Sequence, residues 1–112
     1  MIIQKTITFC KNQTSPLISN SYFNSLSDVL DIQINGVFNS GLIKVEARNI
    51  SNGDWVSLAG INLSDFSIAK NGITKSGLYE FSVVGAREIR INVEEISGEV
   101  TVHGQLISTE ET

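Results

Sequence analysis

Apolar and polar residues alternate with a period of two along most of this 112-residue chain, and no other feature limits the fold as strongly. Successive side chains of a β-strand point to opposite faces of its sheet, so the alternation predicts strands with one buried and one exposed face. No segment of 11 or more residues keeps a helical period. The clearest alternating runs are residues 2–10, 30–35, 43–48, 79–83, 89–94 and 100–106.

Turn-forming residues separate these runs. Gly36 with Asn39-Ser40-Gly41, and later Ser97-Gly98, predict turns between strands, and the Asn52-Gly53 step predicts a β-hairpin. Residues 60–75 fit either a helical turn at 63–66 or a strand at 66–69. Seven or eight short strands at this spacing are typical of two-layer all-β folds, and the length suits one domain. We therefore expect an all-β, single-domain antiparallel β-sandwich with an N-terminal arm or long loop.

The chain divides into three parts within that one domain. We expect an N-terminal strand and polar arm or loop over residues 1–27, a sandwich body over 28–108 and a frayed acidic tail over 109–112. The arm is polar but carries large apolar side chains that the sandwich pattern leaves unaccounted for. We predict that it docks on a partner through these side chains, which are Leu17, Ile18, Tyr22 and Phe23.

The charge balance argues against a nucleic-acid partner. Eight basic and 12 acidic residues give a formal net charge of −4, without the basic excess that binds phosphate backbones. The longest apolar runs are a few residues, far below the roughly 20 that cross a membrane, and the first residues lack a secretory apolar region. We expect no contact with nucleic acid or membrane.

Few residues could carry out chemistry. The single cysteine, Cys10, and the single histidine, His103, are too few for an internal disulfide or a structural zinc site. His103 lies on the polar phase of its run and is expected to face solvent. Phosphate-binding glycine motifs and the Gly-x-Ser-x-Gly motif are absent. We therefore predict a protein that is not an enzyme and has no cofactor, metal or catalytic residues.

Trp55 follows the predicted hairpin turn and has two interpretations. It is either a core aromatic at the start of its strand or an exposed aromatic on which a sugar stacks. Two further roles follow from the pattern. Tyr79 is expected to bury its ring while its hydroxyl finds a backbone partner, and Arg90 to pair with Glu80 or Glu94 across strands.

From about residue 40 to residue 106 the sequence resembles small β-sandwich structural proteins of tailed bacteriophages, of the head-decoration and head-fibre base type. It departs from their pattern at Ala47, where they often have glycine, and in the longer turn at 49–51. The segments that carry the resemblance are 44–48 (KVEAR), 52–58 (NGDWVSL), 76–85 (SGLYEFSVVG), 88–93 (EIRINV) and 96–104 (ISGEVTVHG).

The resemblance implies a passive structural role. The expected function is a capsid decoration protein, made in the host bacterial cytoplasm and located in the phage particle, that binds the major capsid protein lattice or another virion protein. Two alternatives remain open: a tail, collar or baseplate component, and a carbohydrate- or receptor-binding module that uses Trp55 and Tyr22. The oligomeric state also stays open between a monomer and a homo-oligomer.

Overall fold

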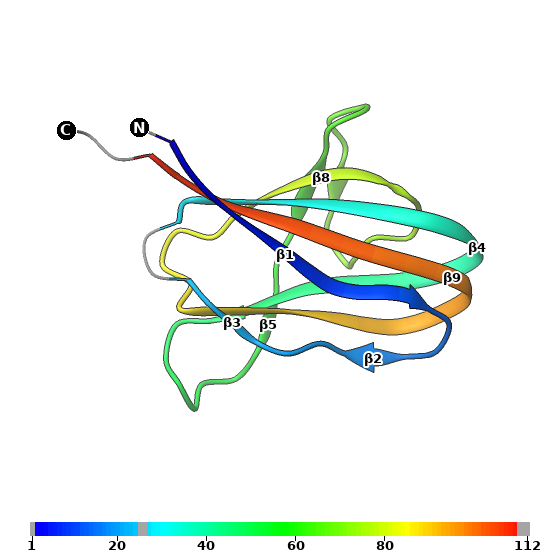
Figure 1. The fold of residues 1–112 in the computed structure, drawn as a ribbon, viewed down its shortest axis with the longest axis horizontal. Helices are drawn as coiled ribbons and strands as arrows, with labels where there is room; N and C mark the ends of the chain where they lie inside the picture. The colour runs from blue at the N-terminus through cyan, green and yellow to red at the C-terminus, as the bar shows by residue number, and fades with distance from the viewer. Residues whose placement is uncertain (1, 25–26, 110–112) are drawn as a thin grey trace.

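The computed structural model describes residues 2–24 and 27–109, which form nine antiparallel strands of one sheet and, within those ranges, no helix. Two strands are far longer than the others, β4 (Val29–Arg48) and β9 (Glu88–Thr109), and they pair along their whole lengths (Figure 1). The all-β antiparallel prediction is confirmed. The remaining strands are β1 (Ile2–Gln13), β2 (Leu17–Ile18), β3 (Tyr22–Phe23), β5 (Val56–Ser57), β6 (Gly60–Asn62), β7 (Ile68–Ala69) and β8 (Gly77–Ser82).

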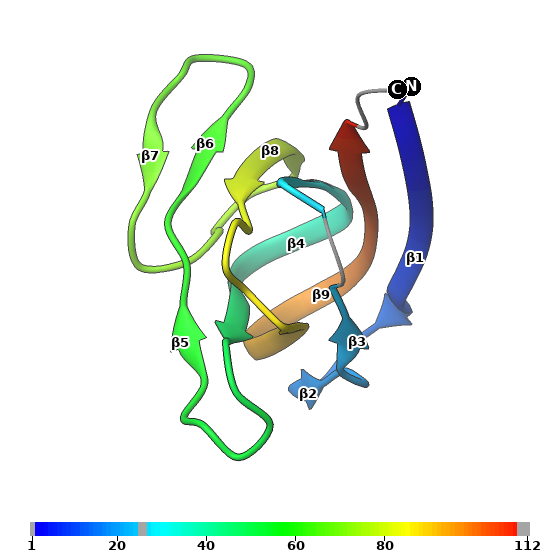
Figure 2. The same ribbon diagram turned by 90° about the vertical axis from the view of Figure 1, so that its left-hand side faces the viewer.

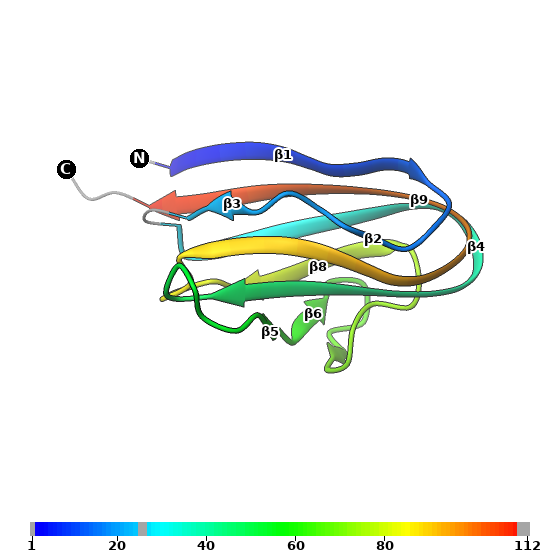
Figure 3. The ribbon, with the colours of Figure 1, turned by 90° about the horizontal axis from the view of Figure 1, so that it is seen from below.

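β4 and β9 bend together near their middles and fold the sheet into two layers (Figure 3). The first layer contains β1, the second half of β9, the first half of β4, and then β8, β6 and β7. The second layer contains β2 and β3, the first half of β9, the second half of β4, and β5. Each half of the two long strands therefore belongs to a different layer.

The turns predicted around Gly36 and at Ser97-Gly98 are wrong, because both segments lie inside continuous strands. Gly36 and Gly98 have positive φ values of 143° and 126°, which favour glycine. A Cβ atom on Gly36 would collide with the Glu99 carbonyl oxygen, and one on Gly98 with the Val37 carbonyl oxygen. These glycines let the two backbones pass closely where the pair bends, so the residues expected to end four short strands instead bend two long ones.

The hydrophobic core lies between the layers and takes the apolar phase of each strand, as the alternation predicts. β1 contributes Ile7, Phe9 and Cys10, so the strand predicted over residues 2–10 packs against the core of the sandwich. Of the tail predicted at 109–112, Thr109 ends β9 and residues 110–112 lie outside the described ranges. The largest fully buried side chains are Phe81, Leu30, Ile32, Ile34, Ile43, Ile73, Ile89 and Ile91.

Two hairpins complete the sheet. β4 and β5 pair antiparallel, and their connection contains a turn in which the Gly53 N–H donates to the Ile50 carbonyl at 3.0 Å, so the predicted hairpin is confirmed. β6 and β7 form a second hairpin at the edge of the first layer, beyond β8 (Figure 2). The ring of Tyr79 is buried and its hydroxyl donates to the Lys75 carbonyl at 3.0 Å, as expected.

Candidate docking surfaces

The four side chains predicted to dock on a partner divide into two inward and two outward residues. β2 and β3 pair with β9, so alternate residues face the core. Leu17 and Tyr22 pack against the core, and the Tyr22 ring meets Phe9 edge to face at 5.3 Å. Ile18 and Phe23 face solvent and are 53% and 57% exposed. Only these two present their side chains to a partner, and their docking role stays a prediction.

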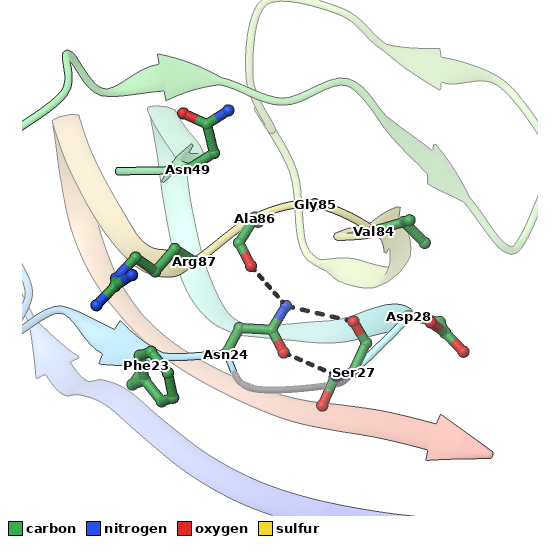
Figure 4. Close-up of a pocket in the computed structure, with 9 residues that line it drawn as sticks. All are labelled: Phe23, Asn24, Ser27, Asp28, Asn49, Val84, Gly85, Ala86 and Arg87. Atoms are coloured by element: carbon green, nitrogen blue, oxygen red, sulfur yellow. Dashed lines mark hydrogen bonds between the residues drawn. The ribbon is translucent and has the colours of Figure 1, made fainter. Parts of the chain in front are cut away.

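Phe23 lies at the rim of an open hollow of about 410 Å³ at one end of the sandwich (Figure 4). Asn24 is the buried polar residue that lines this hollow. Its amide nitrogen donates to the carbonyls of Ser27, Val83 and Ala86, and its amide oxygen accepts from the Ser27 N–H. Because these bonds engage both N–H groups of the amide within the chain, Asn24 anchors Ser27 to the segment 83–86 and has no N–H group left for a ligand.

Trp55 is neither a core residue nor a free aromatic platform. It is half-buried, and the guanidinium carbons of Arg48 and Arg90 lie 4.4 and 4.2 Å from its ring centroid. Arg48 forms an ion pair with Glu88 at 3.1 Å, and Arg90 forms one with Glu46 at 2.8 Å. These cation–π contacts occupy a face of the ring on which a sugar would otherwise stack.

The partner predicted for Arg90 is wrong. Arg90 pairs with Glu46, which lies directly opposite on β4, instead of Glu80 or Glu94. Glu94 instead pairs with Lys44 at 2.7 Å. Glu80 lies on β8, which pairs with β4 and not with β9, and Glu94 lies on the same strand as Arg90.

A cluster of exposed apolar residues surrounds the β6–β7 hairpin, and sequence reasoning missed it. Ile61 and Ile68 are directly opposite each other on β6 and β7, with both side chains on the outer face of the first layer. Leu78 on β8 faces the same side, and Phe66 lies in the connection between β6 and β7. We call Ile61, Phe66, Ile68 and Leu78 the hairpin surface.

Phe66 combines high exposure with a strained backbone. Its side chain is 76% exposed, and its φ of 59° lies in the left-handed region, which costs a non-glycine residue about 1–3 kcal/mol. The Phe66 N–H donates to the Asn62 carbonyl at 2.7 Å, and the Asn62 N–H donates to the Ser67 carbonyl at 2.9 Å. The chain thus holds an exposed aromatic ring in a conformation that it does not adopt readily.

Two side chains hold the backbone of this connection. The Asn62 oxygen accepts from the backbone N–H and the hydroxyl of Ser64, and the Asp65 carboxylate accepts from the same two groups of Ser67. The hydrogen bond from the Ser67 hydroxyl is the main cause of a lowered pKa at Asp65. The sequence signal was the repeated spacing of Asn or Asp two residues before Ser, which is typical of such local turns.

Cys10 and His103 do not form a catalytic pair. Cys10 lies on the core side of β1, where burial raises the pKa of its thiol, so little of the nucleophilic thiolate forms. His103 lies on the outer side of the sheet, and its Nδ1 is 3.3 Å from the Thr8 hydroxyl. Within residues 2–24 and 27–109, no group of three His, Cys, Asp or Glu side chains could hold a metal ion.

Comparison with known proteins identifies the family. The family model described as XepA matches residues 4–106. The chain belongs to the XepA family. A relative from Bacillus subtilis (strain 168), the SPbeta prophage-derived protein YomS, is 27% identical over 103 residues, which cover 92% of this chain and 86% of YomS. The resemblance to phage proteins is thus confirmed at the level of prophage-derived proteins with an all-β fold.

Two solved structures share this fold. The crystal structure of the SPBc2 prophage-derived protein YomS has a TM-score of 0.86, with 96% of each chain covered and 27% identity. The crystal structure of the PBSX exported protein XepA has a TM-score of 0.87 at 18% identity, and the match covers 96% of this chain but 38% of XepA. No helix that could span a membrane occurs in the described part of the chain.

Proposed function

We propose that the protein is a non-enzymatic structural component of a phage particle that decorates the outer surface of the head. The observation that carries this proposal is the hairpin surface, where an aromatic residue is held exposed in a strained conformation. Isolated exposed apolar residues are ordinary on a protein surface, but a cluster at one edge of a sheet is typical of a contact with another protein. Strained residues that the surroundings hold in place gather at functional sites.

The mechanism is passive binding. The hairpin surface docks on the major capsid protein, and because the lattice repeats this site, many copies bind each head. A protein that binds the assembled shell and not its separated subunits stabilises the shell by mass action. The prophage origin of YomS and the shared fold support a phage role, and the rigid hydrogen-bonded connection around Phe66 reduces the entropy lost on docking.

The glycan-binding alternative that used Trp55 and Tyr22 has less support. The Tyr22 ring packs against Phe9 in the interior, and Trp55 is already in contact with two guanidinium groups. Ile18 and Phe23 remain exposed and offer a second surface for the docking role predicted from the sequence. A tail, collar or baseplate location would use the same chemistry on a different partner, so the experiment must separate the locations.

The test is the amount of protein in separated head and tail fractions of purified particles, measured by mass spectrometry. We expect the wild-type protein in the head fraction at a fixed ratio to the major capsid protein. Phe66→Ala should lower that ratio strongly. Phe23→Ala tests whether the second surface, formed by Ile18 and Phe23, also contributes to the ratio. Val37→Ala is the matched control, because Val37 is 87% exposed and lies at the bend of β4, away from the hairpin.

The outcomes differ clearly. Recovery in the tail fraction would contradict the head location but keep a structural role, and absence from both fractions would contradict the whole proposal. A Phe66→Ala protein that stays at the wild-type ratio would show that the hairpin surface is not the contact. Sedimentation of the free protein would show whether it docks as a monomer or as a homo-oligomer.

A further inference from the structure

The outer face of the first layer contains a hollow of about 380 Å³ at its centre, which shares Leu78 with the hairpin surface but not Ile61, Phe66 or Ile68. Four neighbouring strands contribute to it, and the sheet register brings their side chains together. Thr6 on β1 lies opposite Gln105 on β9, which lies opposite Asp31 on β4. The next row contains His103 on β9, Gln33 on β4 and Leu78 on β8. Its volume lies in the range of small-molecule sites, roughly 300–1,000 Å³.

The Asp31 carboxylate contains an oxygen that accepts no hydrogen bond from the described residues. Its Oδ1 atom is buried and has no hydrogen-bond partner among the described residues. Burial is the main cause of a raised pKa at this carboxyl, and the charge of Glu80, directly opposite on β8, adds to it. A buried acceptor without a donor destabilises the fold. The hollow lies over this carboxyl.

The other side chains around the hollow both donate and accept hydrogen bonds. Gln33 donates from Nε2 to the Asn35 side chain at 3.3 Å, which leaves its oxygen as an acceptor. His103 contacts Thr8 through Nδ1, and its ring also lines the hollow. Gln105 brings a complete amide to the same face. A hydroxyl group matches such a mixture because it both donates and accepts, whereas an ammonium group only donates.

We propose that this hollow binds one sugar unit of a glycan, with Asp31 accepting hydrogen bonds from its hydroxyl groups. Gln33, Gln105 and His103 complete the polar contacts, and Leu78, which is 46% exposed, provides an apolar wall for the C–H groups of the ring. The site does not include Trp55, and sugar binding would be a function in addition to docking on a capsid. It would give the protein a second partner, a glycan.

The test is a titration of the isotope-labelled protein by NMR, with the backbone and side-chain amides of Gln33 and Gln105 as reporters. The probes are the methyl glycosides of glucose, galactose and N-acetylglucosamine. We expect at least one to give saturable shifts confined to the hollow. Asp31→Asn, which keeps the size of the side chain, should weaken binding about tenfold or more, because a hydrogen bond to a charged group is lost.

The controls separate this proposal from the docking proposal. Asp54→Asn removes an exposed carboxylate of the second layer, and Phe66→Ala removes the hairpin aromatic, so both should bind the sugar as the wild type does. Thermal unfolding of each variant shows that it is folded. The absence of saturable shifts with all three glycosides would overturn the proposal. A fourth probe, lysine with its α-amino and carboxyl groups blocked, offers an ammonium group. Saturable shifts with this probe alone would also overturn the proposal, since they would show that the hollow selects a cation.

Discussion

Phe66 offers a stability prediction with an unusual sign. At an ordinary exposed position, glycine is less stable than alanine by about 0.5–1 kcal/mol, because it loses more backbone freedom on folding. At a left-handed position a non-glycine residue carries a penalty of about 1–2 kcal/mol that glycine does not. With a φ of 59° at residue 66, Phe66→Gly should therefore be more stable than Phe66→Ala by about 0.5–1 kcal/mol.

The comparison between the two variants removes the contribution of the ring. The Phe66 side chain is 76% exposed, so it buries about a quarter of the roughly 200 Å² that a phenylalanine buries in a core. At about 25 cal/mol per Å², losing it costs about 1 kcal/mol. Both substitutions lose this amount equally, and the difference between them reports the backbone alone.

The assay is urea unfolding at 25 °C, with the free energy of unfolding extrapolated to water for both variants. Gln4→Gly and Gln4→Ala provide the control, because Gln4 is exposed on the regular strand β1 and should show the usual order, with alanine more stable. If Phe66→Ala were as stable as Phe66→Gly or more stable, the left-handed strain at this residue would be refuted. The case for a functional aromatic at the hairpin would then lose its main support.

Three further predictions follow from the described structure. Gly98→Ala should destabilise the fold by more than 2 kcal/mol, roughly the cost of a severe backbone clash, whereas Gly85→Ala, with open space around it, should cost about 1 kcal/mol in the same urea assay. The raised pKa of Asp31 means that its ionised form destabilises the folded state. Asp31→Asn should therefore increase stability at pH 7 but not at pH 3, which lies below the ordinary pKa of 3.8. An equal effect at both pH values would contradict this. Cys10 should react with a thiol reagent only as fast as the protein unfolds, and rapid modification of the folded protein would contradict its burial.

The strands were predictable because alternation is a local property of the sequence. Residues 30–35 and 43–48 were both recognised as strands, with their buried side chains assigned to the correct phase. That they belong to one strand was not predictable. Gly36 has the same chemistry in a turn and in a bend, and only the Glu99 carbonyl on the opposite strand shows why a glycine is needed there.

The candidate sites were harder to predict because each depends on contacts between distant segments. Ile61 and Ile68 have the composition of buried strand residues, and they are exposed because no further strand or layer among the described residues covers them. Asp31 is one of 12 acidic residues in the sequence, and it lies on the polar phase of its alternating run. Only the register places Thr6 and Gln105 beside it, and those partners come from strands far away in the sequence.

Binding of the purified protein to phage heads that lack it tests the central claim most directly. Heads from a phage with its gene deleted are mixed with increasing amounts of wild-type or Phe66→Ala protein, and the bound protein is measured after sedimentation. We predict saturable binding of the wild type at a fixed ratio to the major capsid protein, with greatly weakened binding of the variant. Failure of the wild-type protein to sediment with the heads, or equal binding by both proteins, would contradict a head-decorating function through the hairpin surface.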